Sequence, residues 1–417
     1  MNYFIKKSEY STKEENYTIN LPSSKSEANR ALIIQALTQS GVPEVNNLAA
    51  ARDTQTLKRL LDNSASEILF DVIDAGTTMR FLTAYLALTT EQTVEITGTE
   101  RMKERPISIL VASLNALGCH ITYKEKEGYP PLVISNFGQQ QIDEIAIAGN
   151  VSSQYISALL MIAPLLPLGL TIKITAPVYS KPYINMTIGL MQKSGISVKS
   201  DENVLKIAPG AYTAMQHTVE SDWSGASYWF SLVALSEPGT QMLLKGLKQK
   251  SLQGDQAITE IMQKLGVTTN YNDEGIILLK NDSTLPELLT IDFRDFPDLA
   301  QTVVACCIVL KVNLKMTGLE SLRIKETDRI DALNNEISKF GCSLIESSTG
   351  QWVMNADNFE VQHNTTINTY EDHRMAMSFA PLAAKFPLII EEIEVVNKSY
   401  PTFWTDLASV GFELEQQ

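Results

Sequence analysis

An internal repeat constrains the fold of this 417-residue chain more than any other feature. Segments that read as a helix, a glycine, a strand, a polar turn and a second strand recur, and the glycine suits the left-handed end of a helix. They lie at residues 108–135, 187–210, 257–280 and 332–355, with a shorter fifth at 403–417. Their glycines are 77, 71, 75 and 70 residues apart, at Gly118, Gly195, Gly266, Gly341 and Gly411. This spacing predicts copies of one α/β unit.

A second, more apolar helix is expected once per period, opening with residues suited to an N-cap. Six such stretches occur, at residues 24–37, 74–88, 150–163, 221–235, 296–310 and 371–384. Because one such unit cannot bury its own apolar face, several units must share a core. We therefore expect two domains of three units each, residues 21–220 and residues 1–20 plus 221–417, joined by a two-strand hinge near residues 20 and 220.

The charge balance argues against several classes of partner. Lys and Arg number 34 against 48 Asp and Glu, a net charge of −14, so we expect neither nucleic acid nor an anionic membrane as partner. The N-terminus shows no apolar stretch of signal-peptide length, and the uncharged run 156–172 contains two prolines and a glycine, which favours a core helix over a membrane span. We expect a cytoplasmic monomer whose four cysteines are reduced, since they form no CxxC pair.

Cations precede all six apolar helices. A helix N-terminus presents free amide donors and partial positive charge, so an adjacent Lys or Arg makes an anion site. Several such sites on an acidic protein predict small anionic ligands, although any one of these cations is as readily a solvated surface charge. The cations are Arg52, Arg101, Lys103, Arg105, Lys181, Lys245, Lys248, Lys250, Arg323, Lys325 and Lys398.

The densest cluster is Lys25, Ser26 and Arg30, a point charge, a hydroxyl and a guanidinium fork suited to phosphate or carboxylate. A serine-capped helix with solvated charges is the alternative. The cluster lacks the glycines of a P-loop, so no cradle for ATP is predicted. Other polar groups that precede predicted helices are Gly76, the cations of 101–105, Ser152, Ser153, Gln154, Ser180 and Tyr183.

Two carboxylates stand out. Asp298 lies before an apolar helix, where a helix cap is the alternative, and Glu326 lies between Lys325 and Arg329, where a surface ion-pair network is the alternative. The four histidines share no metal-ligand spacing, so we expect no metal and no cofactor.

Ten segments, in order, resemble the EPSP synthase (3-phosphoshikimate 1-carboxyvinyltransferase) family, from about Leu21 to Phe403. They are LPSSKSEANRAL, DAGTTMR, ERMKERPI, GNVSSQYISALLM, SKPYI, SDWSGASYW, FPDLAQT, LRIKETDRI, YEDHRMAM and NKSYPTF. The resemblance implies an α/β fold of two similar domains, each of three βαβαββ units in an inside-out α/β barrel. It implies transfer of the enolpyruvyl group of phosphoenolpyruvate to the 5-hydroxyl of shikimate 3-phosphate, with release of phosphate, in the shikimate pathway to chorismate.

The resemblance also implies roles for individual residues. Those that would hold phosphoenolpyruvate are Lys25, Gly76, Arg101, Gln154, Arg329, Arg374 and Lys398. Those that would surround shikimate 3-phosphate are Lys25, Ser26, Arg30, Ser152, Ser153, Gln154, Ser180, Tyr183, Asp298, Ser321 and Lys325. Asp298 resembles the carboxylate that hydrogen-bonds the reacting hydroxyl, and Glu326 resembles the one near the enol carbon. Asp298 is therefore our candidate base for the hydroxyl proton, and Lys25 and Glu326 are both candidates for moving the proton at the enol carbon.

Four positions depart from the family pattern: Ser23 replaces Gly, Asp74 replaces Asn, Phe81 replaces Pro and Ser321 replaces Asn. Asp74 is unexpected, because a carboxylate repels an anionic substrate unless a cation neutralises it. Two other functions stay open: enolpyruvyl transfer to UDP-N-acetylglucosamine on the same fold, and anion binding without catalysis. Carboxylates at the site favour an enzyme, because a simple anion binder gains nothing from them.

Overall fold

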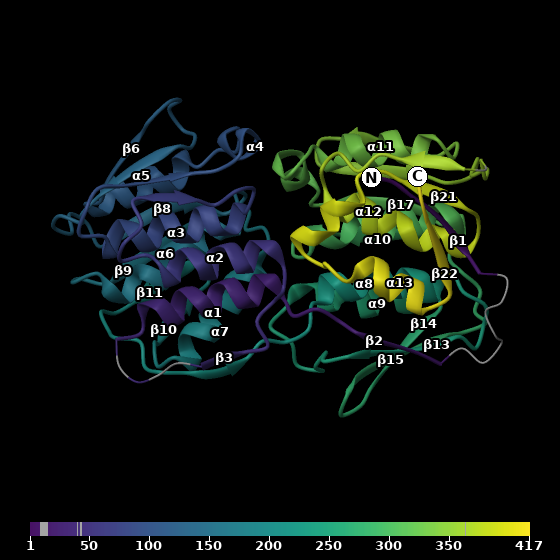
Figure 1. Cartoon of the computed structure of the whole chain (residues 1–417), viewed down its shortest axis with the longest axis horizontal. Helices are drawn as coiled ribbons and strands as arrows, with labels where there is room; N and C mark the ends of the chain where they lie inside the picture. Colours follow the sequence, from purple (N-terminus) through teal and green to yellow (C-terminus); the bar gives the residue numbers. More distant parts are fainter. Residues whose placement is uncertain (9–15, 40, 42–43, 363) are drawn as a thin grey trace. The chain divides into compact units, whose positions relative to one another are not determined.

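The computed structural model describes residues 1–8, 16–39, 41, 44–362 and 364–417, and it divides into two compact units (Figure 1). Unit 1 comprises Met1–Pro22 and Glu220–Gln417, and unit 2 comprises Ser23–Val219. The chain therefore leaves unit 1 after Pro22 and re-enters it at Glu220. In Figure 1 the purple strands β1 and β2 accordingly lie among the green and yellow elements of unit 1.

The described residues of unit 2 form three sheets. Two have four strands each, in the orders β4-β5-β7-β6 and β10-β11-β9-β8, and the third pairs β3 with β12. The strands are β3 (Glu44–Asn46), β4 (Leu69–Asp71), β5 (Val94–Thr97), β6 (His120–Tyr123), β7 (Leu132–Ser135), β8 (Glu144–Ala148), β9 (Leu170–Thr175), β10 (Val198–Asp201), β11 (Val204–Ile207) and β12 (Gln216–Thr218). The helices are α1 (Lys25–Leu37), α2 (Arg52–Asp62), α3 (Gly76–Thr89), α4 (Glu100–Lys103), α5 (Ser108–Leu117), α6 (Ser153–Ile162), η1 (Ala163–Leu165) and α7 (Lys181–Lys193).

Unit 1 also contains three sheets, each of four strands: β14-β15-β13-β2, β16-β17-β19-β18 and β20-β21-β1-β22. The strands are β1 (Tyr3–Lys7), β2 (Asn16–Asn20), β13 (Gln241–Lys245), β14 (Val267–Tyr271), β15 (Gly275–Lys280), β16 (Leu288–Asp292), β17 (Asn313–Thr317), β18 (Ser343–Ser348), β19 (Gln351–Asn355), β20 (Thr365–Ile367), β21 (Leu388–Ile390) and β22 (Phe412–Gln416). The helices are α8 (Trp223–Ala234), η2 (Gly254–Ala257), α9 (Ile258–Gln263), η3 (Pro297–Leu299), α10 (Ala300–Leu310), η4 (Glu320–Ile324), α11 (Arg329–Ser338), α12 (His373–Phe379), η5 (Ala380–Ala384), η6 (Ile393–Lys398) and α13 (Phe403–Ser409).

The four-stranded sheets share one topology. In each, a parallel pair is extended by two antiparallel strands, as when β4 runs parallel to β5 and β5 antiparallel to β7. The parallel strands are connected through a buried helix, α3 between β4 and β5 and α10 between β16 and β17. This is the βαβαββ unit that the family resemblance implied. The two-stranded sheet of β3 and β12 is a shorter copy among the described residues.

The apolar helices form the centre of each unit because their residues are buried on nearly every side. In unit 1, α8, α10 and α12 pack together, and a hydroxyl from each meets the others: Ser227 Oγ lies 3.1 Å from Thr302 Oγ1, which lies 3.2 Å from Ser378 Oγ. Strands such as β17 turn alternate residues inward. The helices are therefore inside and the sheets outside, with the helix N-terminal ends placed to carry polar groups.

All six predicted apolar helices are present, and the five repeat glycines have positive φ, from +75° at Gly341 to +106° at Gly118. The glycine pattern missed α2, the sixth copy of the first helix type. That helix ends at Asp62, and its C-cap residue is Asn63 instead of a glycine. The glycine spacing therefore could not predict it.

Candidate functional site

Charged side chains from separate segments of unit 1 meet at the N-terminal ends of its helices. Asp298 lies in η3, directly before α10. Arg329 is the first residue of α11, and Arg374 is the second of α12. Glu326 precedes α11, and Lys398 ends η6. The repeat therefore brings together residues that lie up to 100 positions apart in sequence.

Two aspartates fix the helix starts that carry the arginines. Asp328 caps α11 by accepting a hydrogen bond from Ile330 N at 3.1 Å, and Asp372 caps α12 by accepting one from Arg374 N at 2.9 Å. A side-chain cap stabilises a helix by about 1 kcal/mol and fixes its first turn. The guanidinium groups of Arg329 and Arg374 therefore extend from fixed positions.

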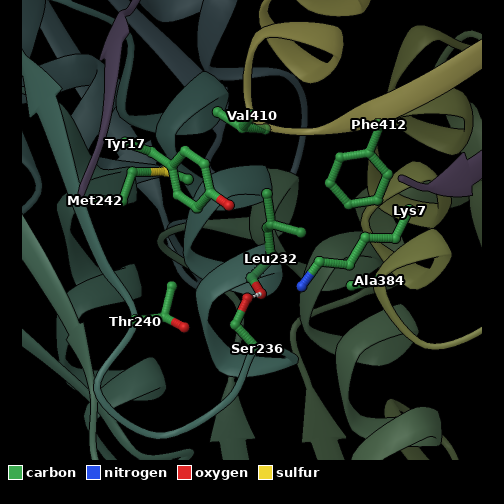
Figure 2. A pocket seen from close by; sticks show the side chains of 9 residues that line it. All are labelled: Lys7, Tyr17, Leu232, Ser236, Thr240, Met242, Ala384, Val410 and Phe412. Carbon is green, nitrogen blue, oxygen red and sulfur yellow. Dashed lines mark hydrogen bonds between the residues drawn. The ribbon is translucent and has the colours of Figure 1, made fainter. Parts of the chain in front are cut away.

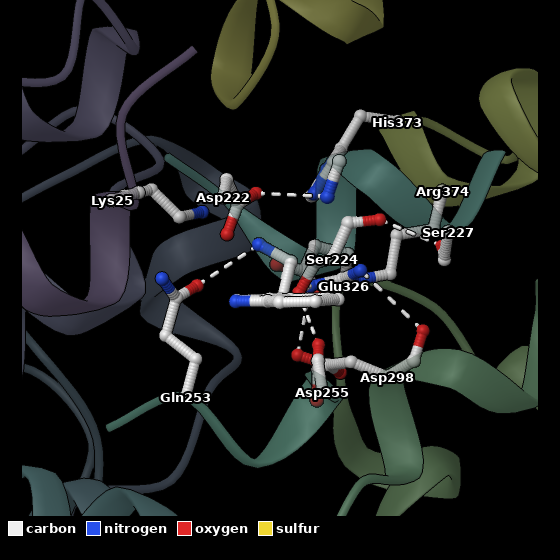
Figure 3. A network of polar contacts seen from close by, with 12 residues as sticks. Lys25, Asp222, Ser224, Ser227, Gln253, Asp255, Asp298, Glu326, His373 and Arg374 are labelled. Atoms are coloured by element: carbon white, nitrogen blue, oxygen red, sulfur yellow. Dashed lines mark hydrogen bonds and ion pairs between the residues drawn. The ribbon is translucent and has the colours of Figure 1, made fainter. Parts of the chain in front are cut away.

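The five charged groups form one continuous network. Arg329 Nη1 donates to Asp298 Oδ1 at 2.9 Å, and its Nη2 donates to Glu326 Oε2 at 2.9 Å. Asp298 Oδ2 accepts from Arg374 Nη2 at 2.8 Å, and Glu326 Oε1 lies 3.4 Å from Lys398 Nζ. Each carboxylate thus links two cations. Figure 3 shows Asp298, Glu326 and Arg374 gathered in this network.

The network holds Asp298 in its ionised form. Burial alone would raise the pKa of this carboxyl, but the positive charges of Arg374, Lys325 and Arg329 outweigh burial and hold the pKa well below its usual value. For Arg329, burial alone would lower the pKa, but the negative charges of the nearby carboxylates outweigh burial and raise the pKa above its usual value. This guanidinium therefore stays charged although it is only 2% exposed. In this state Asp298 is a weak base.

A second carboxyl beside the network behaves in the opposite way. Asp255 is buried and bonded through Oδ2 to the hydroxyl of Ser224, and Ser224 Oγ also lies 3.5 Å from Arg374 Nη2 (Figure 3). Burial, together with the negative charge of Asp298, raises the pKa of Asp255 to about 7. One carboxyl is thus firmly ionised, and its neighbour gains or loses its proton near neutral pH. Such a divergence of pKa values marks groups with different roles in acid–base chemistry.

Unit 2 places Lys25 at the first position of α1. Lys25 Nζ donates to Asp53 Oδ2 at 3.1 Å, and Asp53 is almost completely buried. The N-cap of α1 is Ser24, whose hydroxyl accepts from Glu27 N at 3.4 Å. Ser26 therefore lies in the first turn, where its backbone N–H points out of the helix end.

Arg30 is a buried cation with neutral partners. Its Nε donates to Thr187 Oγ1 at 2.7 Å, its Nη2 to Ser157 Oγ at 3.1 Å and its Nη1 to the carbonyl of Ser26 at 2.8 Å. No carboxylate of the described residues pairs with it, and burial lowers its pKa to about 10. A buried positive charge without a counterion favours binding of an anion.

Two aromatic rings support this guanidinium. Its central carbon lies 5.2 Å from the ring centre of Phe81 and 5.7 Å from that of Tyr183. Aromatic faces attract a guanidinium. Phe81, which replaces the family's usual Pro, thus lies against the Arg30 guanidinium.

Gly76 begins α3, and a different arginine from the expected one lies beside it. A Cβ added at Gly76 would be 2.3 Å from Arg105 Nη1, so the Arg105 guanidinium lies against this backbone. Arg101 instead lies in α4, is 49% exposed and pairs with Glu104 at 2.6 Å. The resemblance pointed to Arg101 among the three cations of residues 101–105, whereas the structure puts the Arg105 guanidinium beside Gly76.

The remaining predicted residues are placed as follows. Ser152 caps α6 by accepting from Gln154 N at 3.4 Å, Ser153 is the first residue of that helix, and Gln154 Nε2 donates to Thr77 Oγ1 at 2.9 Å. Ser180 precedes α7 with a left-handed φ of +55° and makes no capping hydrogen bond with its side chain. A non-glycine residue in this region is strained, and such strain is common at ligand sites.

In unit 1, Lys325 contributes its charge to Asp298 from the segment after η4. The hydroxyl of Ser321 is buried without a hydrogen-bond partner among the described residues. Sequence reasoning missed Asp53, Asp255, Ser224 and Asp372 as parts of these clusters, because their importance comes from burial and from partners distant in sequence.

A pocket elsewhere in unit 1 has a different character (Figure 2). Its walls include Leu232, Met242 and Phe412, and the charged side chain in its lining is Lys7. Its described lining residues include only one cation, unlike the charged cluster around Arg329. Among the described residues, no three or more His, Cys, Asp or Glu side chains are grouped so as to hold a metal ion. In the same part of the chain, no helix combines the length and apolarity that crossing a membrane requires.

Comparison with known proteins identifies the family. The model of the EPSP synthase (3-phosphoshikimate 1-carboxyvinyltransferase) family matches residues 62–407. The chain belongs to the EPSP synthase family. A 3-phosphoshikimate 1-carboxyvinyltransferase of Bacteroides fragilis (strain YCH46) is 49% identical over 402 residues, which cover 95% of this chain and 96% of that protein. The protein of the same name from Buchnera aphidicola subsp. Baizongia pistaciae is 33% identical over 424 residues, with 95% and 96% covered.

A solved structure of EPSP synthase from Acinetobacter baumannii has the same fold. The TM-score is 0.79 at 20% sequence identity, and the match covers 100% of both chains. The expected EPSP synthase fold, an α/β architecture of repeated units, is thereby confirmed.

Proposed function

We propose that this chain transfers the enolpyruvyl group of phosphoenolpyruvate to the 5-hydroxyl of shikimate 3-phosphate and releases phosphate, as a step of the shikimate pathway to chorismate. Membership of the EPSP synthase family supports the reaction and both substrates. The observation in the site that carries the proposal is the network in which Arg329 joins Asp298 to Glu326. We further propose that it acts in the cytoplasm as a monomer, without metal or cofactor.

The reaction is an addition followed by an elimination. A proton is delivered to the CH₂ carbon of phosphoenolpyruvate, which makes the adjacent carbon electrophilic, and the hydroxyl oxygen attacks that carbon while its own proton passes to Asp298. In the second step the bond from that carbon to the phosphate oxygen breaks, a proton leaves the new methyl group, and the double bond re-forms. Glu326 and Lys25 are the groups proposed for moving the proton at the methyl carbon.

The arginine pairs explain how Asp298 becomes a base. While Arg374 and Arg329 bind it, Asp298 has little affinity for a proton. We propose that the carboxylate and phosphate of phosphoenolpyruvate compete for these guanidinium groups. Neutralising them raises the pKa of Asp298 toward its ordinary value, so the carboxylate becomes a better base when substrate is present.

Positioning provides the rest of the catalysis. Proton transfer by a placed group gives about 10² to 10⁴ in rate, which is a fraction of what enzymes achieve. Two polyanions must also be held side by side, and this requires cations facing the developing charge. We assign phosphoenolpyruvate to Arg329, Arg374 and Lys398, with Lys25, Gly76 and Gln154, and we propose Arg105 in the place expected for Arg101. For shikimate 3-phosphate we retain Lys25, Ser26, Arg30, Ser152, Ser153, Gln154, Ser180, Tyr183, Asp298, Ser321 and Lys325.

The choice of acceptor tests this proposal. Purified protein is mixed with phosphoenolpyruvate and shikimate 3-phosphate, with phosphoenolpyruvate and UDP-N-acetylglucosamine, or with phosphoenolpyruvate alone, and released phosphate is measured. We expect release with shikimate 3-phosphate only. Release with the UDP sugar instead would make the chain the other kind of enolpyruvyl transferase, and no release from any mixture would leave an anion-binding protein.

A further inference from the structure

Two ion pairs connect the start of α2 to the starts of its neighbours in unit 2. Asp53, the second residue of α2, pairs with Lys25 of α1 at 3.1 Å, and its carbonyl accepts a hydrogen bond from Thr78 Oγ1 of α3 at 3.1 Å. Arg52, the first residue of α2, pairs with Asp74 at 2.7 Å. Three helix N-termini are thus held together by neighbouring contacts, and the second pair has no role in the mechanism above.

Asp74 is the departure from the family pattern that most needs a physical reason. It lies two residues before Gly76, whose backbone contacts the Arg105 guanidinium. A carboxylate this close to an anion-binding helix start repels an incoming phosphate or carboxylate. The N-terminal end of a helix otherwise favours such groups. The repulsion disappears if Asp74 keeps a cation as its partner.

We propose that Arg52 is a positioning residue that neutralises Asp74 and thereby preserves the affinity of the α3 start for the anionic groups of phosphoenolpyruvate. The inference rests on the proposed function. Asp74 stands where the family more often has a neutral Asn, and neither Arg52 nor Asp74 needs to contact the substrate. The pair acts through its net charge of zero.

The charges of this cluster make the inference quantitative. Lys25, Arg52 and Arg105 oppose Asp53 and Asp74, which leaves a net charge of +1. Removing Arg52 alone lowers the net charge to zero, and removing Arg52 and Asp74 together restores +1. The pair is 46% and 28% exposed, so solvent screens it and a change of about three- to tenfold in affinity is expected.

A double-mutant cycle tests the inference with four proteins: the wild type, Arg52→Gln, Asp74→Asn and the double variant. KM for phosphoenolpyruvate is measured by phosphate release at saturating shikimate 3-phosphate. Arg52→Gln should raise KM about three- to tenfold and leave kcat within about twofold, because only the approach and hold of the anion change. The double variant should return to within about twofold of the wild-type KM, and the effect of Arg52→Gln should shrink at high salt.

Lys58→Gln is the matched control, because it removes a cation of α2 that pairs with Asp62 in the same helix. It should leave KM unchanged. The inference is overturned if Arg52→Gln leaves KM unaltered, or if the double variant keeps the raised KM of Arg52→Gln, since the charge that Arg52 offsets would then not be that of Asp74. Arg52→Lys, which keeps the charge, should behave as the wild type. A larger loss in that variant also contradicts the inference.

Calorimetric titration of the four proteins with phosphoenolpyruvate separates this inference from the proposed function. Binding by the wild type without phosphate release would contradict the transfer reaction, and the four dissociation constants would still decide the role of Arg52. Phosphate release by the wild type, with a double variant that binds phosphoenolpyruvate as weakly as Arg52→Gln does, would contradict the role of Arg52 and leave the reaction standing.

Discussion

The Nη1 nitrogen of Arg329 and the Oδ1 oxygen of Asp298 are 2.9 Å apart, and the guanidinium is almost fully buried. The group proposed as base therefore begins the reaction as a salt-bridge partner. Its basicity depends on what else the arginine binds. In the proposed mechanism, the charge of the substrate therefore raises the basicity of Asp298 by competing for Arg329.

Replacing Asp298 by Asn should lower kcat by about 10² to 10⁴ while KM for phosphoenolpyruvate stays within a few fold, because Asn keeps the shape but cannot accept the hydroxyl proton. Steady-state phosphate release measures both constants. Asp292→Asn is the control, since Asp292 is 42% exposed and pairs with Arg294. A variant of Asp298 that turns over near the wild-type rate would remove this carboxylate from the mechanism.

Arg105 and Arg101 should differ strongly in their effect on substrate affinity. Arg105→Ala should raise KM for phosphoenolpyruvate by at least about tenfold, because a charge-assisted contact to an anion is lost. Arg101→Ala should change KM by less than about twofold, because an exposed ion pair contributes little. Comparison of the KM values of the two variants decides which of the two arginines binds phosphoenolpyruvate. If the order is reversed, Arg101 regains the place that the family resemblance gave it.

Gly76→Ala tests the close approach of backbone and guanidinium. The added Cβ would lie 2.3 Å from Arg105 Nη1, and the flexible arginine must move away. We expect a raised KM for phosphoenolpyruvate and little change in thermal stability. Gly210→Ala provides the control, since the nearest atom to its Cβ is Ile196 Cδ1 at 3.3 Å. Unchanged affinity in the Gly76 variant would show that this contact has no part in binding.

Asp255 predicts a pH dependence of stability. Its pKa is raised to about 7 in the folded chain from an ordinary 3.8, so the folded state retains a proton that the unfolded state releases between these values. Stability from this group is complete below about pH 4 and falls as pH rises to about 7, by at most about 4 kcal/mol. Asp298, whose pKa is lowered, acts oppositely, and its contribution is lost as pH falls below about 4.

Asp255→Asn should remove the loss of stability between about pH 5 and pH 8, measured as the urea midpoint at both values. The amide keeps an oxygen that accepts from Ser224 and cannot ionise. Asp273→Asn, at an exposed position, should retain the wild-type dependence. An Asp255 variant with an unchanged pH slope would show that another group causes it.

The helix pattern and the repeat could be predicted because they depend on local spacing. Each repeat glycine ends a helix with positive φ, and each apolar stretch became a buried helix. The copy that contains α2 was not predicted, because the C-cap residue of this helix is Asn63 and not a glycine. The repeat can be recognised only from local sequence features such as the glycine after each helix. A single different residue at that position is therefore enough for one copy to go unrecognised.

The partners within the site could not be predicted, because they come from segments distant in sequence. Nothing near Asp255 in sequence indicates that Ser224 and Asp298 surround it. The pairing of Arg52 with Asp74 likewise crosses 22 positions. Family resemblance supplied roles at matching positions, and the structure supplied the counterions that no motif contains.

An isotope measurement tests the central claim most directly. Phosphoenolpyruvate labelled with ¹⁸O in the oxygen that bridges carbon and phosphorus is turned over with shikimate 3-phosphate, and the products are analysed by mass spectrometry. Attack at carbon breaks the carbon–oxygen bond, so all the label should appear in phosphate and none in the enol ether product. Label that remains in a carbon product would show cleavage of the phosphorus–oxygen bond, and it would contradict enolpyruvyl transfer by this chain.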